Sequence, residues 1–323
     1  MIDKTKLILE NVDLFPNKEL GYHTYGNRRR NKDVNSYRRF ISLSDEKNAY
    51  ELEIHLNHNI RFDKKQLVVD GNLRKWYFGK DSRQDFTKKK FLQCINLLSN
   101  KIGIDDASLY NAKVTKLETG VILRLKQKER AIINSIFGYK GFDKNTYDKY
   151  GVEFKSSNYD VIFYDHLRRV YNQKGKRQSN FGKITNKNFL FRYEIQSHKM
   201  SGTPMFKEKL NTLLKVRNNW DYIGQNLIKT LGDVEFVKVI SPETYVSIKN
   251  GGKKEMTKYL TFKGMEAIGI ENFRVLLEQM TNKHKSEFKK DFVTLYNSFL
   301  EAEKMDYKKF LIRKLKKRVK ALA

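Results

Sequence analysis

The stretch NFLFRYEIQSH, residues 188–198, constrains the fold more than any other part of this sequence. Side chains alternate between the two faces of a β-strand. One face of this stretch would therefore be apolar and aromatic, with Phe189, Phe191, Tyr193 and Ile195. The other would be almost wholly polar and of mixed charge, with Leu190, Arg192, Glu194, Gln196 and His198. The pattern predicts a strand with one face in the hydrophobic core.

Two other segments divide in the same way. In 112–122, Lys116 and Glu118 share a face, opposite Thr115, Leu117 and Thr119. In 158–166, Tyr159, Val161 and Phe163 lie opposite a mixed face of Asn158, Asp160, Ile162, Tyr164 and His166. Each mixed face includes a carboxylate. Taken strand by strand, such faces can simply meet water, because antiparallel sheets commonly have one wet side.

If these three strands are neighbours, their polar side chains converge on one surface: Glu118, Tyr164, His166, Arg192 and Glu194. Carboxylate oxygens are the ligands that Mg²⁺ and Mn²⁺ prefer. Such a metal polarises a phosphate, a tyrosine hydroxyl can attack it covalently, and an arginine can hold a non-bridging oxygen. The surface therefore predicts phosphoryl transfer assisted by Mg²⁺ or Mn²⁺, with Tyr164 as nucleophile and Arg192 on the phosphate.

The charge balance indicates the kind of partner. The chain of 323 residues has 65 Lys and Arg against 37 Asp and Glu, a formal net charge of +28. Such a charge favours nucleic acid over an anionic membrane surface. The chain has no run of 18 apolar residues, its first residues do not resemble a signal peptide, and its single cysteine, Cys94, forms no disulfide framework. We expect a protein of the cytoplasm with no membrane partner.

Periodicity and cap residues predict the remaining elements. Further strands are expected at 5–15, 38–43, 49–56, 112–125 and 152–157, with a hairpin at 66–79 around Gly71-Asn72. One helix is expected at 85–103, with Asp85 as N-cap and Gly103 at its end, and another at 127–138. After about residue 200 the pattern is helical, at 205–231, 242–250, 255–268, 271–302 and 306–321, with helix starts at Thr203-Pro204 and Ser241-Pro242.

These elements predict an α+β fold, with a central, mostly antiparallel sheet and flanking helices, followed by a smaller helical region. We place a catalytic domain at residues 1–200 and a helical C-terminal region at 201–323. That region ends in a basic helix, in which Leu311, Leu315, Val319 and Leu322 form one apolar stripe. The stripe can pack on the helical region while the basic residues are merely solvated, or the helix can lie on a membrane. In the third alternative, which we favour, the basic residues bind DNA.

Three motifs in order resemble a known family. The segments VTKLETGV (114–121), VIFYDH (161–166) and FLFRYEIQS (189–197) are similar to the motif set of the filamentous-phage gene II replication initiators and related rolling-circle plasmid Rep nickases. In that family an Arg-Ile-Asp strand precedes a Tyr-x-Lys strand and an Arg-Phe-Glu strand. The segment 68–79 resembles a further family motif, and the likeness covers roughly residues 50–200. The resemblance implies the rolling-circle nickase fold.

The resemblance also implies an activity. Members of the family nick one strand of DNA at an origin through a tyrosine, keep the 5′ phosphate covalently attached, and later rejoin the strand. Carried over by motif, Tyr164 is the nucleophile, and Glu118 and Glu194 are metal-site carboxylates. Glu118 stands where the family usually has Asp. His166 stands where lysine is usual, so it can be a metal ligand, a general acid or base near pH 7, or a residue at a helix start.

Other candidates are weaker. His55 and His58 are three residues apart and would lie on opposite faces of a strand. Tyr159 projects to the apolar face, and Tyr171 lies beyond the strand. The chain has no Gly-Lys-Ser/Thr phosphate loop, so separation of the DNA strands would need a host helicase, and copying would need a host DNA polymerase.

The expected DNA contacts are basic residues in loops and in the last helix. They are Arg28, Arg29, Arg30, Arg74, Lys75, Arg168, Arg169, Lys176, Arg177, Lys314, Lys317 and Arg318. The expected substrate is origin DNA, single-stranded or as a supercoiled duplex, in a bacterial host. The rival prediction is a non-catalytic, sequence-specific DNA-binding protein in which Tyr164 only packs.

Overall fold

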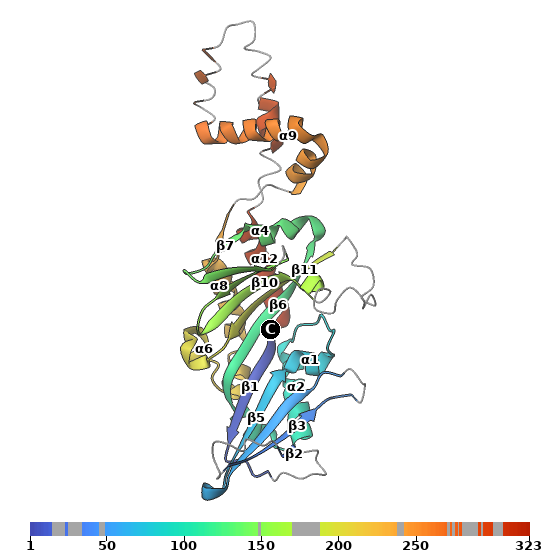
Figure 1. Cartoon of the computed structure of the whole chain (residues 1–323), viewed down its shortest axis with the longest axis vertical. Coiled ribbons are helices and arrows are strands. Elements are labelled where there is room, and N and C mark those ends of the chain that lie inside the picture. The colour runs from blue at the N-terminus through green and yellow to red at the C-terminus, as the bar shows by residue number, and fades with distance from the viewer. Residues whose placement is uncertain are drawn as a thin grey trace.

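The computed structural model describes residues 1–14, 23–24, 34–44, 49–147, 150–169, 188–237, 242–269, 272, 275–276, 278–279, 290–291, 293–299 and 306–323. A ten-stranded sheet runs through the described part of the chain in the order β2-β3-β4-β5-β1-β6-β11-β10-β9-β8 (Figure 1). Every neighbouring pair of strands in it is antiparallel. The predicted α+β class with a mostly antiparallel central sheet is confirmed.

The strands differ widely in length, and the longest lies at the centre of the sheet. Their bounds are β1 Ile2–Glu10, β2 His23–Thr24, β3 Val34–Ile41, β4 Leu52–Asn59, β5 Lys64–Asn72, β6 Lys113–Lys126, β8 Asp143–Tyr147, β9 Gly151–Lys155, β10 Tyr159–Asp165 and β11 Asn188–Ser197. A separate two-stranded sheet joins β7 (Ile136–Gly138) to β12 (Glu235–Phe236).

Helices fill the connections and the C-terminal part. The α-helices with described bounds are α1 Leu73–Phe78, α2 Lys88–Ile102, α3 Asp106–Tyr110, α4 Ile132–Ser135, α6 Pro204–Lys207, α7 Leu213–Asn218, α8 Trp220–Asp233, α9 Pro242–Ile268 and α12 Tyr307–Leu322. Short 3₁₀ helices are η2 Ile60–Phe62, η3 Gln127–Ala131 and η4 Met200–Gly202.

One hydrophobic core joins the sheet to helices from both parts of the chain. The ring of Phe91 in α2 packs against Trp220 in α8 at 5.1 Å, and the hydroxyl of Tyr193 in β11 donates to the carbonyl of Leu227 in α8. The indole of Trp220 donates to the carbonyl of Leu322 in α12. Residues before and after position 200 therefore bury their apolar faces together.

Helix α9 has its own small cluster. Tyr259, Phe262 and Phe299 are buried against one another, and α9 lies beyond the end of the sheet near β7 (Figure 1). The predicted start at Ser241-Pro242 coincides with this helix, whose helical path is broken at Gly252 with φ +57°. The predicted break between 250 and 255 is thus confirmed.

The strand predicted at residues 188–198 forms as β11, with its apolar face in the core. In β11, Phe189, Phe191, Tyr193 and Ile195 are at most 1% exposed. The predicted helix 85–103 forms as α2, and Gly103 ends it with φ +82°. The last predicted helix forms as α12, with its leucines Leu311, Leu315 and Leu322 buried. The alternative in which the apolar stripe packs on the protein is therefore the observed one.

Three local predictions were wrong. Residues 66–79 do not form a hairpin, because β5 runs through Gly71 and the Asn72 side chain caps α1 by accepting from the backbone nitrogen of Lys75 at 2.8 Å. Residues 127–138 form a 3₁₀ turn, a single turn of α-helix and strand β7 in place of one helix. Thr87 caps α2 in place of Asp85, and Asp85 turns inward.

Among the described residues, we find no helix with the length and apolar character that crossing a membrane requires.

Candidate functional site

The three strands that carry the predicted chemistry are neighbours. Strands β6, β11 and β10 lie side by side in that order. In the register, Tyr164 of β10 is opposite Arg192 of β11, and Glu194 of β11 is opposite Gly120 of β6. The Tyr164 hydroxyl donates a hydrogen bond to Glu194 Oε1 at 2.7 Å. The predicted convergence of Tyr164, Arg192 and Glu194 is confirmed by these contacts.

A fourth strand adds a carboxylate that the sequence did not reveal. Asp3 lies in β1, where the register with β6 shifts by one residue between Ile2 and Thr5. Simple alternation would place Asp3 on the same face as the buried Thr5 and Leu7. Such a bulge re-aims side chains; here Asp3 and Lys4 both line the cavity in front of Glu118.

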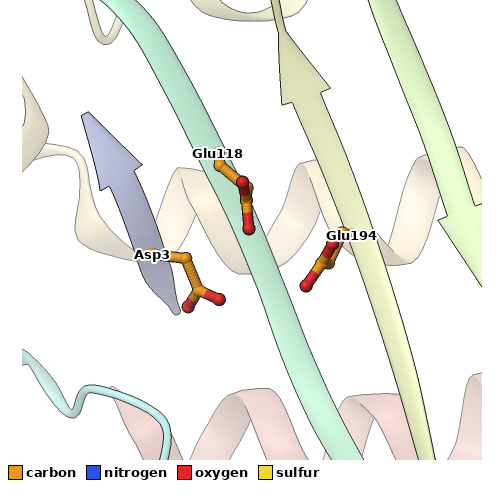
Figure 2. A group of neighbouring side chains, drawn as sticks. All are labelled: Asp3, Glu118 and Glu194. Carbon is orange, nitrogen blue, oxygen red and sulfur yellow. The ribbon is translucent and has the colours of Figure 1, made fainter. Parts of the chain in front are cut away.

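The three carboxylates of β1, β6 and β11 face one common space. Ligand oxygens of Asp3, Glu118 and Glu194 all lie within 4.8 Å of one another, and Figure 2 shows the three side chains reaching from adjacent strands toward the same point. Oxygen-only donor sets of this kind suit Mg²⁺ or Mn²⁺. Asp3 Oδ1 is buried, and within the described residues it accepts no hydrogen bond.

Arg192 contacts three of the buried acids, Asp3, Asp85 and Glu194. It is fully buried, and its Nε donates to Glu194 Oε1 at 2.7 Å. Its Nη1 donates to Asp85 Oδ1 at 2.8 Å, and its Nη2 donates to Asp3 Oδ2. The guanidinium therefore fixes two of the three clustered carboxylates. Gly120 leaves room for it, since a Cβ there would lie 2.9 Å from Arg192 Nη2 and 2.6 Å from the carbonyl oxygen of Tyr193.

Two more arginines complete this network. Arg74 of α1 is buried, and its Nε lies 3.1 Å from Asp3 Oδ1; its Nη1 donates to the backbone carbonyl of Ser82 at 2.8 Å. Arg318 of α12 donates through Nη2 and Nε to Asp85 Oδ2, at 2.8 and 3.2 Å. The C-terminal helix is therefore linked through Asp85 to Arg192.

The electrostatics of the carboxylates favour a cation. Burial, followed by the neighbouring Glu194 and Asp3, raises the pKa of Glu118 well above its usual range. Among the described residues, the Glu118 carboxylate has no ion-pair partner within 4 Å. A bound divalent cation would relieve this repulsion and lower that pKa.

The Tyr164 hydroxyl is held in its neutral form. Burial and the adjacent Glu194 raise its pKa well above the usual value for a phenol. Its proton is shared with Glu194 Oε1, which is therefore placed to accept that proton. The guanidinium carbon of Arg169 lies 4.3 Å from the centre of the Tyr164 ring, so a positive charge stands beside the predicted nucleophile.

His166 lies at the start of a helical turn that covers residues 166–169. Burial, and then Arg192 and Arg74, lower the pKa of His166 to about 4. Its imidazole is therefore neutral at pH 7, and Nδ1 is buried with no hydrogen-bond partner in the described chain. His166 lines the same cavity as Tyr164 but lies outside the carboxylate group.

The site opens into a cavity of about 660 Å³. Its walls are rich in cations that could meet phosphate: Lys4, Arg74, Lys75, Lys80, Arg83 and Arg169. Tyr50 also lines it, with the Lys75 ammonium 5.9 Å from the centre of its ring. We call this space the site cavity. It combines a carboxylate cluster, a tyrosine hydroxyl and basic walls.

The predicted DNA contacts are distributed over several places. Arg74, Lys75 and Arg169 line the site cavity, while the exposed Arg168 lies 3.8 Å from Asp165. Lys314, Lys317 and Arg318 line a second cavity beside α12. The remaining predicted contacts, Arg28, Arg29, Arg30, Lys176 and Arg177, lie outside the described residues.

The weaker candidates lie elsewhere. His55 is 3.1 Å from Glu53 and His58 is 2.7 Å from Asp63, so each imidazole has its own acid. The Tyr159 hydroxyl shares a hydrogen bond with Tyr139 at 3.2 Å in the core. Tyr171 lies outside the described residues.

No protein-family model matches this chain, and it has no match among curated proteins or solved structures either. The resemblance to rolling-circle initiators thus stays a prediction from the sequence motifs.

Asp3 and Asp85 are the site carboxylates that sequence reasoning missed. The aspartate in the opening IDK segment of β1 was available as a signal, but the alternation pattern gave no reason to place it beside Glu118. Asp85 matched a helix-cap pattern, and a cap and an inward-turned acid look alike in sequence.

Proposed function

We propose that this protein is a metal-dependent tyrosine DNA nicking and joining enzyme that initiates rolling-circle replication of a phage or plasmid. The observation that carries the proposal is the hydrogen bond from the Tyr164 hydroxyl to Glu194, at the edge of the carboxylate group formed with Asp3 and Glu118. A nucleophile, a proton acceptor and a set of oxygen ligands thus share one basic cavity.

The chemistry follows from these positions. The Tyr164 oxygen attacks the scissile phosphorus as its proton passes to Glu194 Oε1. The bond from phosphorus to the 3′ oxygen breaks, and that oxygen takes a proton from solvent water and leaves as a 3′ hydroxyl. The downstream strand stays attached to Tyr164 through its 5′ phosphate. Attack by a 3′ hydroxyl on this phosphotyrosine reverses the step and joins the strands.

The carboxylate group fits Mg²⁺ or Mn²⁺, because its donors are all oxygen and the Glu118 carboxylate has no ion-pair partner among the described residues. Asp3 Oδ1 is buried without a hydrogen bond from the described residues, although it lies 3.1 Å from Arg74 Nε. Asp3, Glu118 and Glu194 would hold the ion, which would polarise the scissile phosphate and take up developing charge. Arg192 holds Asp3 and Glu194 in place. Arg192 is fully buried. In this arrangement it orients the carboxylates that would bind the metal, and it does not hold a phosphate oxygen as the sequence predicted.

The substrate class follows from the cavity walls. Cationic side chains such as Lys75 and Arg169 line the cavity that Tyr164 faces, and phosphate oxygens are their natural partners. We propose origin DNA as the substrate, single-stranded or melted within a supercoiled duplex. A host helicase and DNA polymerase would act next, in the cytoplasm of a bacterial host.

The test is formation of a covalent adduct. The protein is incubated with origin single strands labelled at the 3′ end, in Mg²⁺ or Mn²⁺, and separated in SDS. The parent should retain the label, because the downstream fragment stays on Tyr164. Tyr164→Phe should lose the adduct and keep DNA binding. Tyr159→Phe, which removes a core hydroxyl far from the carboxylates, is the matched control and should behave like the parent.

The outcomes separate the candidate functions. An adduct that persists in Tyr164→Phe removes Tyr164 from the reaction. If the parent binds DNA but forms no adduct in either Mg²⁺ or Mn²⁺, the non-catalytic DNA-binding alternative is favoured.

A further inference from the structure

A second cavity lies beside the site cavity, and we call it the α12 groove. Its volume is about 510 Å³. It borders β6 at residues 122–124, beyond the point where β1 ends its pairing with β6. The segment 83–87 and the C-terminal half of α12 form its other walls.

The α12 groove is strongly basic. Its lining cations are Arg83, Arg124, Lys314, Lys317 and Arg318. Asp85 is the one acid among the described residues that line it, and both of its oxygens are already occupied, by Arg192 on one side and by Arg318 and the Ile122 amide on the other. The groove therefore presents positive charge that its own walls do not neutralise.

The three outermost cations are available to a ligand. Arg83, Arg124 and Lys317 are exposed, and no ion pair joins them to an acid of the described chain. Aromatic side chains do not line the groove in the part of the chain described. Cations without aromatic platforms suit phosphates, whereas base stacking needs rings.

The α12 groove is continuous with the candidate site. Arg83 lines both cavities. A chain of hydrogen bonds also joins them, from the Tyr164 hydroxyl to Glu194, Arg192, Asp85 and Arg318, with lengths of 2.7, 2.7, 2.8 and 2.8 Å. The wall of the groove is thus a few side chains from the reacting hydroxyl.

We propose that the α12 groove binds the sugar-phosphate backbone of the same single strand whose scissile phosphate lies in the site cavity. The strand would pass from one cavity to the other over Arg83. The identity of this ligand rests on the proposed function, since a nicked strand must extend on both sides of the scissile phosphate. The contact is to phosphate and carries no sequence preference.

The test measures binding without cleavage. Fluorescein-labelled oligothymidylate is titrated by anisotropy in the presence of a chelator, with the Tyr164→Phe protein as background. The groove variant carries Arg83→Gln, Arg124→Gln and Lys317→Gln. The control variant removes the same charge from exposed lysines that line neither cavity, as Lys89→Gln, Lys316→Gln and Lys320→Gln.

Each phosphate contact adds about 0.7 to the slope of log K against log salt for a single strand. Three lost contacts should therefore lower the slope of the groove variant by about 2, and the control variant should change it far less. The loss should be large for a long strand and small for one too short to span both cavities.

Equal slopes in the two variants would overturn the proposal, and so would a groove variant that loses binding to phosphatidylserine vesicles but not to oligothymidylate. This assay measures binding without cleavage. Its result can therefore be interpreted even if the parent protein forms no covalent adduct with DNA. A selective slope change would then support the groove as a single-strand surface even if the nicking function failed.

Discussion

Asp85→Asn tests whether the buried charge network holds the site together. Asp85 accepts from Arg192 Nη1, from Arg318 and from the Ile122 amide, and its side chain is fully buried. Asparagine keeps the shape, but its amide nitrogen would face a guanidinium donor, and the buried Arg192 would lose one of its three acids. Breaking a buried pair from one side costs about 3–5 kcal/mol, so we expect the free energy of unfolding to fall by about that amount.

The assay is urea unfolding followed by tryptophan fluorescence, which reports on the buried Trp76 and Trp220. Asp13→Asn is the matched control, because Asp13 is exposed, and it should change stability by about 0.5 kcal/mol or less. In an Arg318→Gln background the effect of Asp85→Asn should shrink, since the two changes remove the same contact. An Asp85→Asn protein that unfolds at the same urea concentration as Asp13→Asn would refute the network as a stabilising element.

Three further outcomes are expected. Glu118→Gln should remove the repulsion between Glu118 and its two neighbouring carboxylates and raise the metal-free stability. It should also abolish the stabilisation by Mg²⁺ or Mn²⁺, which for the parent is about 2.7 kcal/mol at a hundredfold excess over Kd; thermal unfolding measures both effects. The folded-state pKa of His166 lies near 4, against an ordinary value of 6.5, so unfolding binds a proton between these values and stability falls as pH drops through that window. His166→Gln should remove up to about 3 kcal/mol of that loss, and an unchanged pH profile would contradict the burial of a neutral imidazole. Leu315→Ala, at a fully buried site in α12, should cost about 2–5 kcal/mol, against no measurable loss for Lys316→Ala; equal effects would mean that α12 does not pack on the core.

The predicted part of the site depended on short-range alternation. Tyr164, Arg192 and Glu194 share a face because each lies on a strand whose opposite side is apolar, and that pattern is visible in the sequence. Neighbouring strands then bring these faces together. The burial of these side chains was not visible in the sequence. It depends in part on Arg74 of α1 and on Asp85, which contact Asp3 and Arg192, whereas the predicted hairpin would have placed residues 72–79 in the sheet.

The role of the C-terminal helix divides in the same way. Its periodicity predicted an amphipathic helix, and α12 forms with its leucines inward. The sequence treated its basic residues alike as a DNA surface, whereas Arg318 turns to Asp85 and Lys317 remains exposed in the α12 groove. The choice between these positions depends on contacts with residues more than two hundred positions away, which periodicity does not contain.

The sequence alone determined the α+β class, the central strands with one apolar face, and the faces on which Glu118, Tyr164 and Glu194 lie. These features follow from alternation along single segments, where the physics is local. The tertiary structure decided the rest: the bulge that turns Asp3 toward Glu118, the inward position of Asp85, and the joining of α12 to the site. Each of these depends on the register between distant strands or on the burial of a charge against a distant partner, and such pairings are fixed only when the whole chain packs.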